Sequence, residues 1–199
     1  MFVQLFIELS FLFLPATVQL DSSEFIATQV ELKECGVLSP VKEVKQLQFS
    51  QSRFISGMKH PIVSSGELTI ESGDEEGPKL TWKTLEPFPD KVMISRSGFQ
   101  IEAASGELKS YDSSRFRKIA SLVLDIHTSN SSEQLSKAFD LKCFKEKEGF
   151  RVSALPKSRS IGKYISTFEL KGSGYSSQIS LVDKRGDRTV IVFSRKKAG

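Results

Sequence analysis

The sequence predicts one α+β domain in which helices pack on a large antiparallel sheet. Apolar and polar residues alternate in short runs over two stretches, from about residue 44 to 101 and from 150 to 193, a pattern typical of antiparallel strands with one buried face. Between them, residues 113–141 carry apolar side chains at the three-and-four spacing of amphipathic helices. The chain has 199 residues, 39% hydrophobic and 26% charged, which fits one folded domain and excludes wholesale disorder and a multi-span membrane protein.

The N-terminal segment is a separate part of the chain. Residues 2–14 are almost uniformly apolar and Pro15 follows them; this length matches the apolar core of a secretory signal and is shorter than the ~20 residues of a spanning helix. No basic residue precedes the apolar core and Glu8 interrupts it, which leaves open a buried or membrane-associated helix. We expect residues 1–20 to be an export signal or apolar N-terminal segment and residues 21–199 to form the single folded domain.

The folded domain is expected to begin with a short helix and to continue as strands. Residues 21–24 offer polar capping side chains, Phe25, Ile26 and Val30 follow at helical spacing, and Gly36 ends the helix. The period then changes to two, and turn signals separate the short runs. The strands expected here carry the apolar residues Leu47, Phe49, Ile62, Val63, Leu68, Ile70, Leu80, Trp82, Val92, Ile94, Phe99 and Ile101.

Helices are predicted in the middle of the chain. Residues 113–128 have a wide apolar face, and residues 131–134 resemble a capping box that starts a second helix running through Phe139 towards Cys143. Alternation returns in the closing strands, and the polar residues 184–187 predict a tight turn between the last two.

Cys35 and Cys143 are the two cysteines of the chain. They are too few for a disulfide scaffold and lack the Cys-x-x-Cys spacing of zinc or redox sites. In an exported protein they can join, closing a loop of about a hundred residues and stabilising the fold by up to ~4 kcal/mol in the chain-entropy model. Two separate half-buried thiols are the alternative, and the sequence leaves both open.

The sequence contains no converging set of catalytic groups. His60 lies in a turn and His127 near the end of the apolar helix, where a charged imidazole would suit the helix dipole, and we expect structural roles for both. Residues 172–174 lack the spacing of a hydrolase elbow. Residues 74–76 are acidic but fit a solvated turn, and the basic residues 195–197 fit a solvated tail. We therefore expect no enzyme activity, no cofactor, no bound metal and no nucleic-acid partner.

The early strands carry motifs of a known family. Phe49-Ser50-Gln51, Gly66-Glu67-Leu68 and Leu80-Thr81-Trp82 precede Val92-Met93-Ile94 and Ser97-Gly98 in an order that resembles the LolA-type periplasmic carriers of outer-membrane lipoproteins. Pro61 to Gly66 and Trp82 to Pro89 resemble the motifs Pro-x-Val-Ser-x-Gly and Trp-x-Thr-x-x-Pro-Phe-Pro of LolA-like relatives. The motifs cover residues 47–98, and the remaining chain fits the family by layout.

The resemblance implies an incomplete antiparallel β-barrel, a strongly curved sheet with helices forming a lid over an apolar cavity. It implies a monomeric carrier in the periplasm of a Gram-negative bacterium that shuttles an acylated lipoprotein or lipid between donor and acceptor proteins of the envelope. One departure stands out. The family places a lid-binding arginine shortly after its second strand, where this chain has Glu71-Ser72, and neither Arg53 nor Arg96 matches that position. The departure allows a different cargo, such as a phospholipid, a fatty acid or a polyene-type lipid.

The candidate ligand-binding residues are apolar and follow from this layout. The expected cavity wall consists of Leu47, Phe49, Leu68, Ile70, Leu80, Trp82, Val92, Ile94, Phe99 and Ile101, and the expected lid of Phe116, Ile119, Leu122, Val123 and Phe139. Burial patterning alone fits ordinary core residues as well. The main rival interpretation is a structural or interaction protein of the cell envelope with a fully packed sheet. An acyl-handling enzyme would need a nucleophile beside a base, and no such pair is evident.

Overall fold

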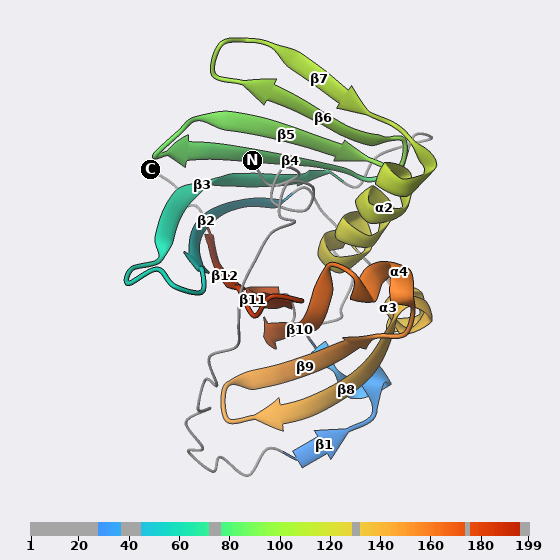
Figure 1. The fold of residues 1–199 in the computed structure, drawn as a ribbon. Coiled ribbons are helices and arrows are strands. Elements are labelled where there is room, and N and C mark those ends of the chain that lie inside the picture. The colour runs from blue at the N-terminus through green and yellow to red at the C-terminus, as the bar shows by residue number, and fades with distance from the viewer. Residues whose placement is uncertain (1–27, 37–44, 72–76, 129–131, 174–175, 196–199) are drawn as a thin grey trace.

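The computed structural model describes residues 28–36, 45–71, 77–128, 132–173 and 176–195, and it confirms the predicted α+β class (Figure 1). The described strands form a 12-stranded antiparallel sheet that is curved and not closed. Its strands are β1 (Thr28–Val30), β2 (Lys45–Phe54), β3 (Ile62–Glu71), β4 (Lys79–Glu86), β5 (Asp90–Ser95), β6 (Gly98–Ala103), β7 (Leu108–Tyr111), β8 (Phe139–Glu146), β9 (Gly149–Pro156), β10 (Ile165–Gly172), β11 (Ser176–Asp183) and β12 (Arg188–Arg195).

Two meanders meet in the middle of the sheet, whose strand order is β1-β8-β9-β10-β11-β12-β2-β3-β4-β5-β6-β7. The first meander runs outward from β2 to β7. The chain then crosses to the far half of the sheet and returns from β8 to β12, which pairs with β2 over Arg188↔Phe54 to Arg195↔Leu47. Because β7 and β8 lie in opposite halves of the sheet, the connection between them must cross the sheet.

Helices make this crossing on the concave side of the sheet (Figure 1). They are α2 (Ser114–Thr128) and α3 (Ser132–Ala138); a short α4 (Arg159–Gly162) and the 3₁₀ turn η1 (Leu32–Glu34) lie elsewhere. The apolar face of α2 packs on β5 and β6, with Ala120 and Leu124 fully buried. Within the described ranges, no helix combines the length and apolarity needed to span a membrane.

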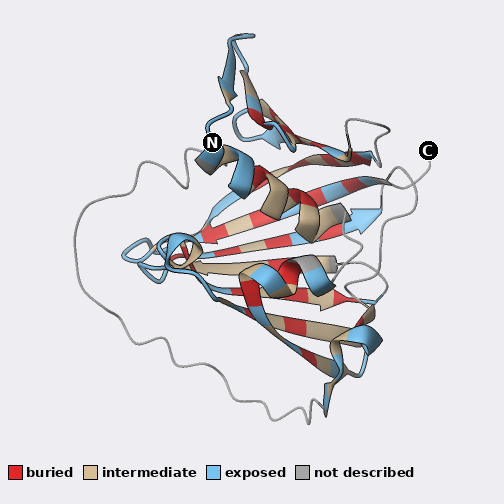
Figure 2. Ribbon diagram, turned by 90° about the vertical axis from the view of Figure 1, so that its right-hand side faces the viewer, coloured by how far each residue is buried: buried red, intermediate tan, exposed pale blue. Residues whose placement is uncertain are grey.

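The core lies along the concave face of the sheet. The concave face is formed by the side chains of the strands that point inward. Buried and less buried residues alternate along the strands (Figure 2), as expected when one face of a pleated sheet is covered. In β2 the buried positions are Leu47, Phe49, Gln51 and Arg53. The alternation predicted for residues 44–101 is therefore present, and the predicted turn at 184–187 separates β11 from β12.

Two predicted helical segments are strands instead. Residues 28–30 form β1, which pairs with residues 143–145 of β8, so the helix predicted from Phe25 onwards is wrong for this part. The β-branched Thr28 and Val30 favour an extended backbone, and pairing with β8 decides the outcome.

The second predicted helix is too long. Helix α3 ends at Ala138, and Phe139 begins β8, where it pairs opposite Pro156. Phe139, Leu141 and Cys143 alternate, which fits a strand as well as the helical spacing inferred from them. The predicted export signal over residues 1–20 and the acidic turn at 74–76 lie outside the described residues.

Candidate functional site

The residues predicted to form a cavity wall come together on the concave face. Cross-strand pairing places them in two rows, Leu47–Leu68–Trp82–Val92–Ile101 and Ile70–Leu80–Ile94–Phe99, and puts Phe49 opposite Gly66. Leu68 and Leu80 have 0% exposure and Leu47 has 7%, whereas Ile101 is half-buried. The wall is thus one continuous apolar surface whose side chains are almost completely covered.

The residues predicted to form a lid lie in two different places. Phe116 seats the start of α2, with its ring 6.5 Å from Phe99 and 5.2 Å from Tyr111. Ile119, Leu122 and Val123 continue along the apolar side of α2 and remain half-buried.

Phe139 is not part of a helical lid. It is the first residue of β8 and is completely buried, with its ring 5.9 Å from that of Phe168. The strand pairing of β8 with β9 extends to this residue, so it belongs to the sheet.

The concave face includes more strands than the predicted cavity wall, which covered only residues 47–101. A further row crosses the closing strands, consisting of Val30, Cys143, Val152, Leu170, Ile179 and Ile191, and it ends beside Gln51 of β2. The alternating residues of the closing strands carried this signal, but sequence alone did not show that these strands adjoin β2.

An aromatic cluster of Phe49, Trp82, His127 and Phe193 joins the end of α2 to the middle of the sheet. The Trp82 ring lies 4.2 Å from Phe49, 6.0 Å from Phe193 and 6.3 Å from His127, and His127 lies 5.6 Å from Phe193. Burial lowers the pKa of His127 from 6.5 to about 4. The imidazole is therefore neutral at pH 7 and does not supply the charge that would suit the helix dipole.

A second contact between α2 and the sheet is a partly exposed ion pair. The Nη2 atom of Arg96, in the turn between β5 and β6, lies 3.4 Å from Oδ1 of Asp125 on α2. Both side chains retain contact with solvent, so the pair is a weak link. Arg96 thus contacts the crossing helix, although its place in the sequence does not match the family's lid-binding arginine.

Polar side chains are buried further along β2. Arg53 and Asp187 form an ion pair with 3.6 Å between Nη2 and Oδ2, and Gln51, Ser64 and Thr189 are buried beside them. Sequence reasoning missed this polar cluster, which is defined here as Gln51, Arg53, Ser64, Asp187 and Thr189. One signal was present, because Gln51 occupies an inward position in the alternation that begins with Leu47 and Phe49.

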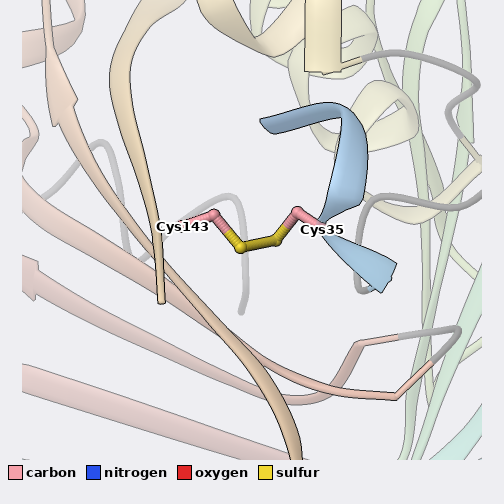
Figure 3. The surroundings of a disulfide bond; sticks show 2 residues. All are labelled: Cys35 and Cys143. Atoms are coloured by element: carbon pink, nitrogen blue, oxygen red, sulfur yellow. A yellow bond between two sulfur atoms is a disulfide. The ribbon is translucent and has the colours of Figure 1, made fainter. Parts of the chain in front are cut away.

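A disulfide bond joins Cys35 to Cys143, which settles the alternatives left open by the sequence (Figure 3). The two Cα atoms lie 6.1 Å apart, and the bond fastens the segment after β1 to β8. An open groove of about 400 Å³ borders it, lined by residues 29–32 and 141–143. The groove is lined by none of the wall or lid residues, and its lining is a mixture of polar and apolar side chains.

In the part of the chain that the structure describes, no three His, Cys, Asp or Glu side chains lie close enough together to hold a metal ion. His127 is enclosed by aromatic rings. The concave face is apolar over most of its area and polar at one place.

The comparisons with known proteins yield distant structural likenesses. No protein-family model and no curated protein sequence matches the chain. A LolA superfamily protein from Nitrosomonas europaea aligns with a TM-score of 0.44 and 8% identity, covering 84% of this chain and 92% of that one. A structure described as an outer membrane lipoprotein-sorting protein domain from Vibrio parahaemolyticus gives 0.40 and 10%, covering 78% and 86%. The MucA/MucB complex of Pseudomonas aeruginosa gives 0.42 and 14%, covering 75% and 50%. Likenesses at this level assign no family to the chain.

Proposed function

We propose that the protein is a non-enzymatic carrier that binds acyl chains of a lipoprotein or lipid between α2 and the concave face and shuttles them towards the outer membrane. The observation that carries this proposal is the pairing of a continuous apolar face with an amphipathic helix whose flank is only half-buried. Ala120 and Leu124 of α2 are fully buried, whereas Ile119, Leu122, Val123 and Ile126 pack against the same core and remain half-buried, so the apolar surface of α2 extends further round the helix.

The energetics of acyl binding suit such a surface. Each CH₂ group that leaves water gains about 0.8 kcal/mol, so a chain of about 16 carbons gains roughly 12 kcal/mol before the cost of association. No catalytic group is needed. Because the wall residues are almost completely covered, α2 has to move outward for a chain to enter, and its weak Arg96–Asp125 link permits such a movement.

The proposed location is the periplasm of a Gram-negative bacterium, with envelope proteins as donor and acceptor and the protein acting as a monomer. The Cys35–Cys143 disulfide supports it, because such bonds form and persist in oxidising compartments. The apolar segment at residues 2–14 points to export as well.

A second candidate function is a packed structural or interaction protein of the cell envelope. The low exposure of the wall residues, 0% at Leu68 and Leu80, favours it, since a permanently open cavity would leave such side chains accessible. The two candidates differ in whether an acyl chain can enter beneath α2.

Ligand analysis separates the candidates. For the carrier, native mass spectrometry and lipid extraction of the purified protein are expected to show bound acyl species, and the neutral fluorescent probe N-phenyl-1-naphthylamine is expected to bind and to be displaced by lipids.

Ile119→Asn on the apolar flank of α2 should weaken probe binding about tenfold, a loss of about 1.4 kcal/mol. Lys118→Asn, at an exposed position of the same helix, is the matched control and should leave binding unchanged. If the purified protein carries no lipid and binds no probe, the carrier proposal fails and the packed structural or interaction protein is favoured.

A further inference from the structure

The polar cluster lies directly beyond the apolar part of the concave face. Gln51 and Arg53 are the next two inward residues of β2 after Leu47 and Phe49, and successive inward positions are about 7 Å apart. Cross-strand pairing places Gln51 opposite Ser64 of β3 and Arg53 opposite Thr189 of β12. The concave face therefore changes from apolar to polar along a single strand.

The charge of Arg53 is already balanced within the cluster. Its Nη2 atom lies 3.6 Å from Oδ2 of Asp187, whose other oxygen accepts a hydrogen bond from the backbone N–H of Ser56 at 3.0 Å. Arg185 lies 4.0 Å from the same Oδ2 atom. Burial lowers the pKa of Arg53, while Asp187 and then Asp183 raise it. A further negative charge placed here would meet two carboxylates as well as the two guanidinium groups.

Two polar atoms of this cluster have no hydrogen-bond partner among the described residues. They are Nε of Arg53, a donor, and Oε1 of Gln51, an acceptor, and neither atom is accessible to solvent. The residues are 9% and 7% exposed. A buried polar group without a partner is costly, so native proteins satisfy nearly all of them. The unpartnered donor of Arg53 and the unpartnered acceptor of Gln51 lie on neighbouring inward positions. Together they match a ligand that accepts one hydrogen bond and donates another.

We propose that the polar cluster binds the neutral polar head of an acylated ligand whose chain lies along the apolar part of the concave face. In a monoacylglycerol, the ester carbonyl accepts from Arg53 Nε–H and a free hydroxyl donates to Gln51 Oε1. A fatty-acid carboxylate fits less well, because it cannot donate to Gln51 and it meets Asp187 and Asp183. This inference rests on the proposed function and names the chemical class of its ligand.

The test compares two competitors with the same chain. Displacement of N-phenyl-1-naphthylamine is measured with 1-palmitoylglycerol and with palmitate at pH 8, below the concentrations at which either amphiphile aggregates. Wild type is expected to bind the acylglycerol at least tenfold more tightly. Gln51→Leu removes the unpartnered acceptor without disturbing the Arg53–Asp187 pair, and Arg53→Lys keeps a positive charge for Asp187 but lacks Nε–H. Both variants should reduce the preference to about threefold or less.

Gln48→Leu is the matched control, since it makes the same substitution at an exposed position on the opposite face of β2; it should retain the full preference. Equal affinity for both competitors, or an unchanged preference in Gln51→Leu, overturns the inference and indicates a structural cluster satisfied by water. In that case the carrier function survives, because the probe and both lipids still bind. Failure of the probe and of both lipids to bind overturns the carrier function together with the inference.

Discussion

Gly66 determines how the middle of the sheet packs. A Cβ atom at this position would collide with the carbonyl oxygen of Lys83 and lie 2.8 Å from the Phe49 ring. The pairing of β3 with β4 also shifts register between Ser65 and Gly66. The absence of a side chain thus lets β4 approach β3 closely while Phe49 lies across the glycine and contacts Trp82.

Gly66→Ala should therefore lower the free energy of unfolding by about 2–3 kcal/mol, the usual cost of overpacking a core. Urea unfolding measures it. Gly162→Ala is the control, because its Cβ would meet only Pro156 at 3.9 Å, an ordinary contact distance, and should change stability by less than about 0.5 kcal/mol. A Gly66→Ala protein as stable as wild type would show that β3 and β4 can separate without cost.

His127 makes stability depend on pH in a defined window. Its folded-state pKa of about 4 lies below the ordinary 6.5, so between these values the unfolded chain binds more protons than the folded one. The stabilisation from neutral His127 is complete above about pH 6.5 and is lost as the pH falls towards 4.

The difference in unfolding free energy between wild type and His127→Phe isolates this residue from other titrating groups. Phenylalanine keeps the ring packing against Trp82 and Phe193 but does not titrate. Between pH 7.5 and 4.5, wild type should lose up to about 3 kcal/mol relative to the variant. Guanidinium unfolding at both pH values measures the change, and parallel pH profiles for the two proteins would contradict the buried position of the imidazole.

At the scale of elements, we expect the disulfide to hold β1 on the sheet. β1 is only three residues long and lies at the edge of the sheet, so its own pairing contributes little. The bond joins two residues that are 108 positions apart in sequence, and in the chain-entropy model a loop of this length stabilises the folded state by roughly 4–5 kcal/mol.

The double variant Cys35→Ala/Cys143→Ala should lose about 2–4 kcal/mol of unfolding free energy. Its amides at residues 28–30 should also exchange with solvent faster than those of β9. Wild type treated with a reductant serves as the control and should match the variant in both measurements. Reduced wild type that retains the stability of the oxidised protein would show that the pairing with β8 holds β1 without the bond.

At the scale of the whole molecule, the sequence predicted the elements that local pattern determines and missed those that distant contacts determine. Alternation at Leu68/Ile70 and Leu80/Trp82 sufficed to predict β3 and β4 and the direction of their side chains. β1 was missed because residues 143–145 impose its extended form from more than a hundred positions away. The polar cluster was missed because β12 supplies Thr189 and the turn before it supplies Asp187, and only the pairing of β12 with β2 brings them to Arg53.

The remaining question at this scale is whether the covered concave face can admit a ligand. A ligand that binds only the folded protein stabilises it by RT ln(1 + [L]/Kd), about 2.7 kcal/mol at a hundred times Kd. 1-Palmitoylglycerol at such a concentration should raise the melting temperature, and hydrogen exchange should slow most in α2, because the helix then closes on an added apolar chain. Glycerol at the same concentration is the control and should change neither. A packed interaction protein has no site beneath α2, so its melting temperature and its exchange in α2 would be unaffected by the lipid. The response of α2 therefore distinguishes a helix that serves as a movable cover from one that is a fixed part of the core.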